Sequence, residues 1–184
     1  CIALMRENKQ VNYKDQLKKS METMAEDKDV CFIGYGVKIG GRAMGTLTNI
    51  SDEQLIETPV SENLMVGAGI GMSLSGRKPV VFIERMDFIL NCSDAIVNHL
   101  DKINSISGGE YNPTMILWVV VGNKNKALFT GTTHTQDFSD AFSKMLSFPV
   151  VKLTDSNMIE ETYVEAYNNL NKHSTMIVEY KDYI

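Results

Sequence analysis

One uninterrupted apolar stretch, running from Thr114 to Val121, most restricts the folds open to this chain. A strand without alternating polar residues is buried on both faces, which is typical of a parallel sheet covered by helices. Five shorter segments predict further strands, at 30–34, 55–58, 78–83, 149–153 and 176–179. The chain is therefore expected to form a mainly parallel sheet.

Helical patterns separate these strands. Leu17, Met21 and Met24 recur at helical spacing within 13–25. Further helices are predicted from Glu62 onward and at 87–105, 137–146 and 157–170, while the glycine-rich segment 34–48 indicates a loop. This alternation predicts an α/β fold with a doubly wound, mainly parallel sheet and helices on both faces.

The length of 184 residues suits one domain, which we place at 1–184 with 1–12 as an amino-terminal extension and no further carboxy-terminal domain. An apolar share of 43% and a charged share of 22% are ordinary for a globular protein. The net charge of -5 gives no support to a nucleic-acid partner or to an anionic membrane surface. We expect neither partner.

The three cysteines, Cys1, Cys31 and Cys92, are odd in number and form no CxxC pair, which argues against a disulfide framework and a thiolate zinc site. No apolar run approaches the roughly 20 residues of a membrane span. The first residues also lack the pattern of a secretory leader. Together these features predict a protein of the reducing cytoplasm.

The segment 58–72 places a carboxylate at the start of a helix that is rich in small residues. Pro59 and Ser61 indicate the helix start, so Glu62 falls in the first turn, where the helix dipole stabilises a negative charge. Glu62 could simply complement the dipole, and the glycines could simply allow another helix to pack closely. Alternatively, Glu62 carries chemistry at the edge of the sheet, where ligands bind beyond the carboxyl ends of parallel strands.

Two further candidates follow predicted strands and could meet Glu62 at this edge. Phe88 fits either a buried aromatic contact or a ring that stacks on a flat ligand. His134 lies in the polar loop 131–136, where it is either a solvated surface residue or a group that exchanges protons or donates to an oxyanion. His99 and His173 are weaker candidates.

Three other kinds of site find little support. The glycines of 67–71 have the wrong spacing for a dinucleotide fingerprint and lie inside the helix. No G-x-S-x-G nucleophile elbow is present for a serine hydrolase. The histidines are scattered and no carboxylate-histidine pair has ligand spacing, so no metal site is expected.

Several segments in order along the chain resemble the pyrimidine-binding domain of thiamine-diphosphate enzymes, most closely the β subunit of the decarboxylating component of 2-oxo acid dehydrogenase complexes. The resemblance covers roughly residues 13–180 and rests on six segments: 58–62, 76–81, 86–88, 94–98, 107–109 and 131–136.

The resemblance implies a role for each candidate residue. Glu62 would accept a hydrogen bond from the pyrimidine nitrogen para to the amino group and favour the imino tautomer, which removes the thiazolium proton. Phe88 would stack on the pyrimidine ring, with Val60 and Met86 beside the cofactor. His134 would face the reacting carbonyl of the substrate.

Other parts of the sequence depart from the family pattern. Gly34-Tyr35-Gly36-Val37 replaces an acidic Gly-Glu-Asp-Val, and the Gly-Asp-Gly motif through which the family holds diphosphate and Mg²⁺ does not occur. We therefore expect an α-type partner subunit that carries the diphosphate-binding domain and Mg²⁺, in an α2β2 assembly.

The expected function is that of the pyrimidine-side subunit of a heteromeric thiamine-diphosphate enzyme. It would act on a 2-oxo acid, by decarboxylation with aldehyde or acyl transfer, and only together with its partner. Two alternatives stay open: ketol transfer from a ketose by a two-component transketolase, and a non-catalytic structural or regulatory subunit.

Overall fold

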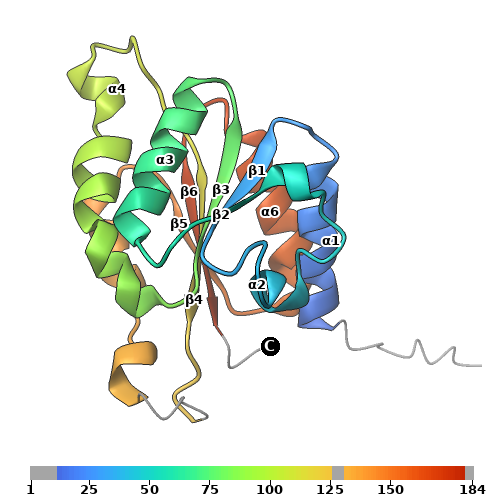
Figure 1. Cartoon of the computed structure of the whole chain (residues 1–184). Helices are drawn as coiled ribbons and strands as arrows, with labels where there is room; N and C mark the ends of the chain where they lie inside the picture. The colour runs from blue at the N-terminus through green and yellow to red at the C-terminus, as the bar shows by residue number, and fades with distance from the viewer. Residues whose placement is uncertain (1–11, 126–130, 181–184) are drawn as a thin grey trace, which may run out of the picture.

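The computed structural model describes residues 12–125 and 131–180 of the chain. Six strands form one sheet in the order β2-β1-β3-β4-β6-β5, and every pair of neighbouring strands is parallel (Figure 1). Helices cover both faces of the sheet, which confirms the predicted doubly wound α/β fold. Of the expected amino-terminal extension, 1–12, only Asn12 lies within the described residues, and its side chain caps the first helix.

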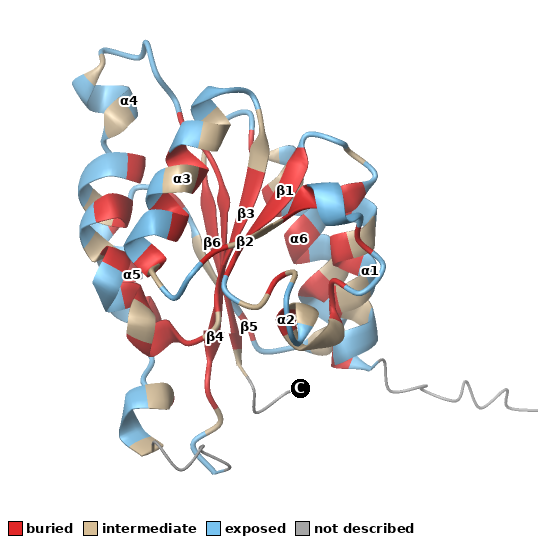
Figure 2. Ribbon diagram, viewed as in Figure 1, coloured by how far each residue is buried: buried red, intermediate tan, exposed pale blue. Residues whose placement is uncertain are grey.

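The central strands carry the apolar runs found in the sequence. They are β1 (Val30–Gly34), β3 (Lys78–Ile83), β4 (Ile116–Val121) and β6 (Thr175–Tyr180), and all six residues of β4 are buried. The edge strands, β2 (Leu55–Glu57) and β5 (Val150–Leu153), are short and partly exposed. Figure 2 shows buried residues concentrated along the middle of the sheet. Burial on both faces explains why these strands lack polar alternation.

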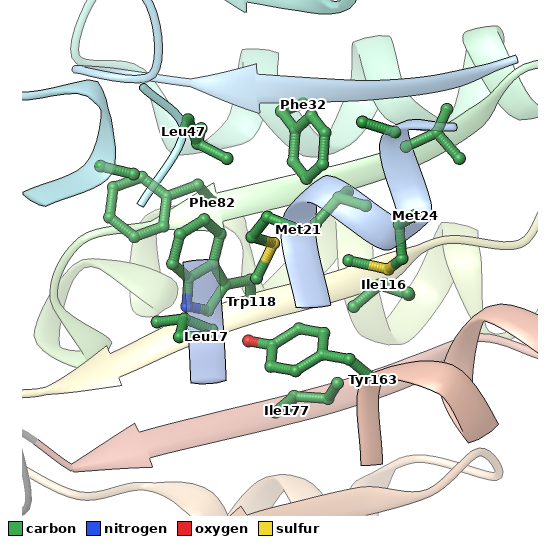
Figure 3. Packing of buried hydrophobic residues seen from close by; sticks show 14 of the residues in the cluster. Leu17, Met21, Met24, Phe32, Leu47, Phe82, Ile116, Trp118, Tyr163 and Ile177 are labelled. Carbon is green, nitrogen blue, oxygen red and sulfur yellow. The ribbon is translucent and has the colours of Figure 1, made fainter. Parts of the chain in front are cut away.

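Helices α1 (Tyr13–Ala25) and α6 (Ile159–Asn168) cover one face of the sheet. The apolar side of α1 packs Leu17 and Met21 onto this face near Phe82 and Trp118 (Figure 3). The Phe82 and Trp118 rings are tilted by 50°, with their centroids 4.4 Å apart. This aromatic pair forms a dense centre for the core on that side.

The other face is covered by α3 (Glu62–Leu74), by the helical segments between β3 and β4, and by α5 (Ser139–Met145). A Cβ atom at Gly69 would lie 2.9 Å from the Val81 side chain and 3.1 Å from that of Met115. Gly69 therefore allows α3 to approach the sheet closely, whereas Gly67 and Gly71 have no such neighbour. The expected close approach is thus made to a strand and not to another helix.

The predicted single helix at 87–105 is wrong. The segment forms a 3-10 helix η2 (Met86–Cys92), a π-helix η3 (Ala95–Leu100) and a short α4 (Ile103–Ile106). Such irregular turns are common at functional sites. The apolar periodicity was real, because Ile89, Ile96 and Leu100 are buried, but it did not distinguish between the helix types.

Two other segments differ in detail from the expectation. The loop 34–48 contains the four-residue α2 (Arg42–Gly45), in which Arg42, Ala43 and Met44 all have positive φ. Ahead of β2 lies the short η1 (Asp52–Gln54), and η5 (Ser156–Met158) precedes α6, so the last helix begins with a 3-10 turn.

Candidate functional site

The carboxyl ends of the strands lie at the lower edge of the sheet in Figure 1, and the three candidate residues follow three of these strands. Glu62 begins α3 after β2, Phe88 lies in η2 after β3, and His134 ends η4 (Gly131–His134) after β4. Crossover connections in a parallel sheet bring such residues to one edge. The structure therefore supplies the shared edge that the sequence suggested.

Glu62 is sheltered although it lies at a helix end. It is 7% exposed, while the neighbouring Val60 is 65% exposed. Ser61 occupies the N-cap position, as the predicted helix start requires, although its side chain forms no capping hydrogen bond. The carboxylate of Glu62 thus lies in the first turn of α3, where the helix dipole favours a negative charge.

One oxygen of Glu62 is engaged by the protein. Asn91 Nδ2, from η2, donates a hydrogen bond to Oε2 at 3.3 Å. No residue in the described part of the chain donates to Oε1. Glu62 therefore keeps one acceptor atom for another molecule.

The thiol of Cys92 lies close to this carboxylate. Burial, with a smaller contribution from the negative charge of Glu62, raises the pKa of Cys92 to about 12. Its Sγ donates to the backbone oxygen of Ile89 at 3.3 Å. Cys92 is thus a neutral structural thiol and not a nucleophile. Cys31 is also free and buried, and Cys1 lies outside the described residues.

Phe88 and His134 are in direct contact. Their ring centroids are 5.2 Å apart, and the planes are inclined by 86° in an edge-to-face arrangement. Both side chains are half-buried. The Thr133 hydroxyl lies 3.2 Å from His134 Nδ1. Nε2 is therefore the ring nitrogen left to interact with a ligand.

The backbone of His134 crosses the end of β4 at close range. A Cβ atom at Gly122 would lie 1.9 Å from the His134 carbonyl oxygen, so only glycine fits at this crossing. Gly122 directly follows the strongest apolar strand, and this position could have identified it from the sequence as a residue of the site. Asn91 carried no such signal, because it lay inside an expected regular helix.

Met86 behaves differently from the other candidates. Its side chain is 0% exposed, and its Sδ accepts a hydrogen bond from the Phe138 backbone N-H at 3.3 Å. It therefore supports η2 from inside the core and presents no surface to a ligand. Val60, by contrast, presents an exposed apolar side chain next to Glu62.

A pocket of about 210 Å³ opens at the same edge, beyond the carboxyl ends of β1 and β3. Its lining includes Tyr35, Met44, Phe82 and Glu84. The Glu57 carboxylate anchors the adjoining loop by accepting hydrogen bonds from the backbone N-H groups of 36, 38 and 39. Partial burial raises the pKa of Glu57, but these backbone donors outweigh it and hold the pKa below its ordinary value.

Metal ligands do not cluster here. Within residues 12–125 and 131–180, no group of three or more histidine, cysteine, aspartate or glutamate side chains could hold a metal ion. In the same part of the chain, no helix has the length and apolar character needed to cross a membrane.

The chain is similar to β subunits of 2-oxo acid dehydrogenases. It is 28% identical over 148 residues to the mitochondrial pyruvate dehydrogenase E1 component subunit beta of Saccharomyces cerevisiae, a match that covers 78% of this chain and 40% of that protein. It is 26% identical over 140 residues to the 2-oxoisovalerate dehydrogenase subunit beta of Pseudomonas aeruginosa, covering 73% and 39%. The chain thus spans about two fifths of the length of these relatives.

A solved structure shares the fold. It is a split-gene transketolase, described as an inactive beta4 tetramer, with a TM-score of 0.65 and 13% sequence identity over 91% of this chain and 49% of that one. Residues 9–182 match the family model described as "Transketolase, pyrimidine binding domain". Because this match covers nearly the whole sequence, the chain belongs to the transketolase pyrimidine-binding domain family.

Proposed function

We propose that this protein is the pyrimidine-side subunit of a heteromeric thiamine-diphosphate enzyme that acts on a 2-oxo acid. One observation carries the proposal: Glu62 is sheltered at the first turn of α3, with Oε2 held by Asn91 and no donor to Oε1 from the described residues. The relatives named as dehydrogenase beta subunits support the 2-oxo acid as substrate class.

The side chains at this edge fit the pyrimidine half of the cofactor. A ring nitrogen that shares a proton needs a carboxylate acceptor, and Oε1 of Glu62 is such an acceptor. The half-buried Phe88 ring and the exposed Val60 side chain offer apolar surface for a flat heterocycle. Met86 would act indirectly, from inside the core, by holding η2 in place.

When bound, the cofactor supplies a carbanion nucleophile for the carbonyl carbon beside the carboxylate of the substrate. Glu62 Oε1 would accept a hydrogen bond from the protonated pyrimidine nitrogen and would thereby keep that proton on the pyrimidine. Asn91 fixes the rotamer of Glu62 by bonding to Oε2. If Nδ1 accepts from the Thr133 hydroxyl, His134 would carry its proton at Nε2 and would donate it to the substrate oxygen as negative charge develops there.

The pocket of about 210 Å³ lies at the same sheet edge and could take the side chain of the substrate. Its aromatic and aliphatic lining, with Phe82 and Met44, suits an apolar group. The loop beside it contains Gly34-Tyr35-Gly36-Val37, where the family resemblance leads one to expect acidic residues. We infer that this loop contributes to the choice of substrate.

Assembly forms part of the proposal. We infer that an α-type partner supplies the diphosphate-binding domain and Mg²⁺ and covers the edge that carries Glu62, in an α2β2 complex. Support comes from the names of the relatives, which are beta subunits, and from the lack of a Gly-Asp-Gly motif in this sequence.

The test is to copurify the chain with its native partner and to measure thiamine-diphosphate binding by calorimetry, with and without that partner. We expect tight binding only in the complex, and substrate-dependent turnover with a 2-oxo acid. Turnover with a ketose phosphate instead would favour the transketolase alternative. Tight cofactor binding with no turnover of either substrate class would favour a non-catalytic subunit.

A further inference from the structure

A buried carboxylate ties the segment that carries His134 to the start of η2. Asp87 is 8% exposed. Its Oδ1 accepts hydrogen bonds from the Gln136 side-chain Nε2 at 2.8 Å and from the Gln136 backbone nitrogen at 3.3 Å. The next bond along the chain, from the Phe138 N-H to Met86 Sδ, reinforces the connection. Two successive residues of η2 therefore hold residues 136–138.

These bonds act on the geometry more than on the stability. The other carboxylate oxygen, Oδ2, is buried and has no hydrogen-bond partner among the described residues. A buried carboxylate that is only half satisfied gains little net stability, because desolvation offsets its hydrogen bonds. Its two bonds to one residue are, however, directional, and they determine where Gln136 lies.

His134 depends on this connection. It lies two residues before Gln136, and its ring packs edge-to-face with that of Phe88, the residue directly after Asp87. Gly122 limits the backbone of His134 itself, because any Cβ atom at position 122 would collide with the His134 carbonyl. The backbone that follows the His134 side chain is thus restrained twice, at the His134 carbonyl by Gly122 and at Gln136 by Asp87.

We propose that Asp87 is the positioning residue for His134 and acts through Gln136. This inference rests on the proposed function, in which His134 Nε2 faces the substrate. Asp87 itself touches neither substrate nor cofactor in this assignment. It sets the distance between the His134 ring and Phe88, and therefore the place at which the proton on Nε2 is presented.

The first experiment uses the free full-length chain and needs no activity. NMR would follow the His134 ring protons, which are shifted by the ring current of Phe88, and the exchange rate of the Gln136 amide. We expect Asp87→Ala to abolish this ring-current shift and to speed exchange of the Gln136 amide about tenfold, as the loss of one hydrogen bond predicts. Asp87→Asn keeps an oxygen acceptor and should restore both signals.

Two controls separate positioning from misfolding. Asp140→Asn removes an exposed carboxylate that pairs with Lys152, and it should leave the His134 signals unchanged. The buried indole of Trp118, the single tryptophan of the chain, reports the fold of each variant. Should Asp87→Ala fail to fold, Gln136→Ala provides the same test from an exposed position. Unchanged His134 signals in both Asp87→Ala and Gln136→Ala would overturn the inference.

The second experiment uses the reconstituted complex. We expect Asp87→Ala to lower kcat about tenfold with unchanged cofactor affinity, and Asp87→Asn to recover most of the loss. A displaced His134 ring with full turnover would support the positioning of His134 by Asp87 and would refute the catalytic role proposed for His134. The two proposals therefore fail by different outcomes.

Discussion

Two sheltered glutamates, Glu179 in the core and Glu62 at the sheet edge, show how location decides the use of a carboxylate. Glu179 on β6 is 0% exposed, and its Oε1 accepts a hydrogen bond from the Tyr163 hydroxyl at 2.6 Å. Glu62 is 7% exposed and accepts one bond from the exposed Asn91. The first carboxylate is enclosed by its own chain, whereas the second lies where another molecule can reach it.

The enclosed carboxylate perturbs the core. Burial raises the pKa of Glu179 to about 7, although the Tyr163 hydrogen bond and the nearby Trp118 indole oppose the rise. Within the described residues, Tyr13 Oη, Trp118 Nε1 and Glu179 Oε2 are buried without hydrogen-bond partners. We therefore expect Glu179 to make the stability of the fold depend on pH, whereas the chemistry proposed for Glu62 takes place at the edge.

The largest effect is expected at the edge. Glu62→Gln in the reconstituted complex should lower turnover roughly 1,000-fold. The substitution removes the carboxylate that would position the proton, but it changes few packing contacts. Steady-state kinetics and the urea midpoint of the free chain would measure both properties. Glu53→Gln makes the same chemical change at an exposed residue and should leave both unaltered. Wild-type turnover in Glu62→Gln would refute the assignment.

The next largest expected effect is a change in the free energy of unfolding with pH. Because the folded pKa of Glu179 is raised from 4.5 to about 7, the unfolded chain releases this proton first as pH increases. The free energy of unfolding should therefore fall between these two pH values, by about 3 kcal/mol in all, and level off above them. Urea unfolding from pH 4 to 8 tests this, and Glu179→Gln should remove that fall while Glu53→Gln retains it.

His134→Ala should have a smaller effect on catalysis than Glu62→Gln. We expect turnover to fall roughly 10- to 100-fold, with a loss that depends on the acceptor, because in the proposed function the histidine donates a proton to the substrate and not to the cofactor. Kinetics with several acceptors would show this dependence. If His134→Ala left turnover unchanged with every acceptor, His134 would lie outside the active site.

Tyr163→Phe should have the smallest effect. It removes the hydrogen bond to Glu179, so the unfolding free energy should drop by about 1 kcal/mol, and the pH-dependent fall should extend to higher pH. Tyr167→Phe is the matched control on the same helix. Its hydroxyl donates to Asp27, whose pKa is lowered to about 2 by hydrogen bonds from Lys78 and Tyr167, so the pH profile above 4 should not move. Identical pH profiles for Tyr163→Phe and the wild type would show that Tyr163 does not influence the pKa of Glu179.

The fold was predictable where burial is complete. The strands around Val81, Trp118 and Ile177 are apolar on both faces because helices cover both sides, so their composition alone indicates a parallel sheet. The segment 87–105 was not predictable in this way. Apolar spacing marks the buried side of a helix, but the contacts of Asp87 with Gln136 and of Asn91 with Glu62 accompany a 3-10 turn instead.

The residues of the candidate site also form two groups, those that the sequence indicates and those that only packing reveals. Glu62, Phe88 and His134 could be selected from the sequence because each follows a predicted strand. The roles of three other residues, Asn91, Asp87 and Gly122, depend on contacts with residues that are distant along the chain. The burial of Met86 was also decided by packing, which leaves this side chain beneath the site.

Local patterns of apolar residues, together with the order of strands and helices, were enough to predict the parallel α/β sheet and the residue types at its edge. The folded chain was needed to show which oxygen of Glu62 is held, how the His134 ring packs with Phe88, and that Glu179 is fully enclosed. Hydrogen bonds and ring contacts act over a few ångströms, so they depend on how distant segments pack together and not on local sequence.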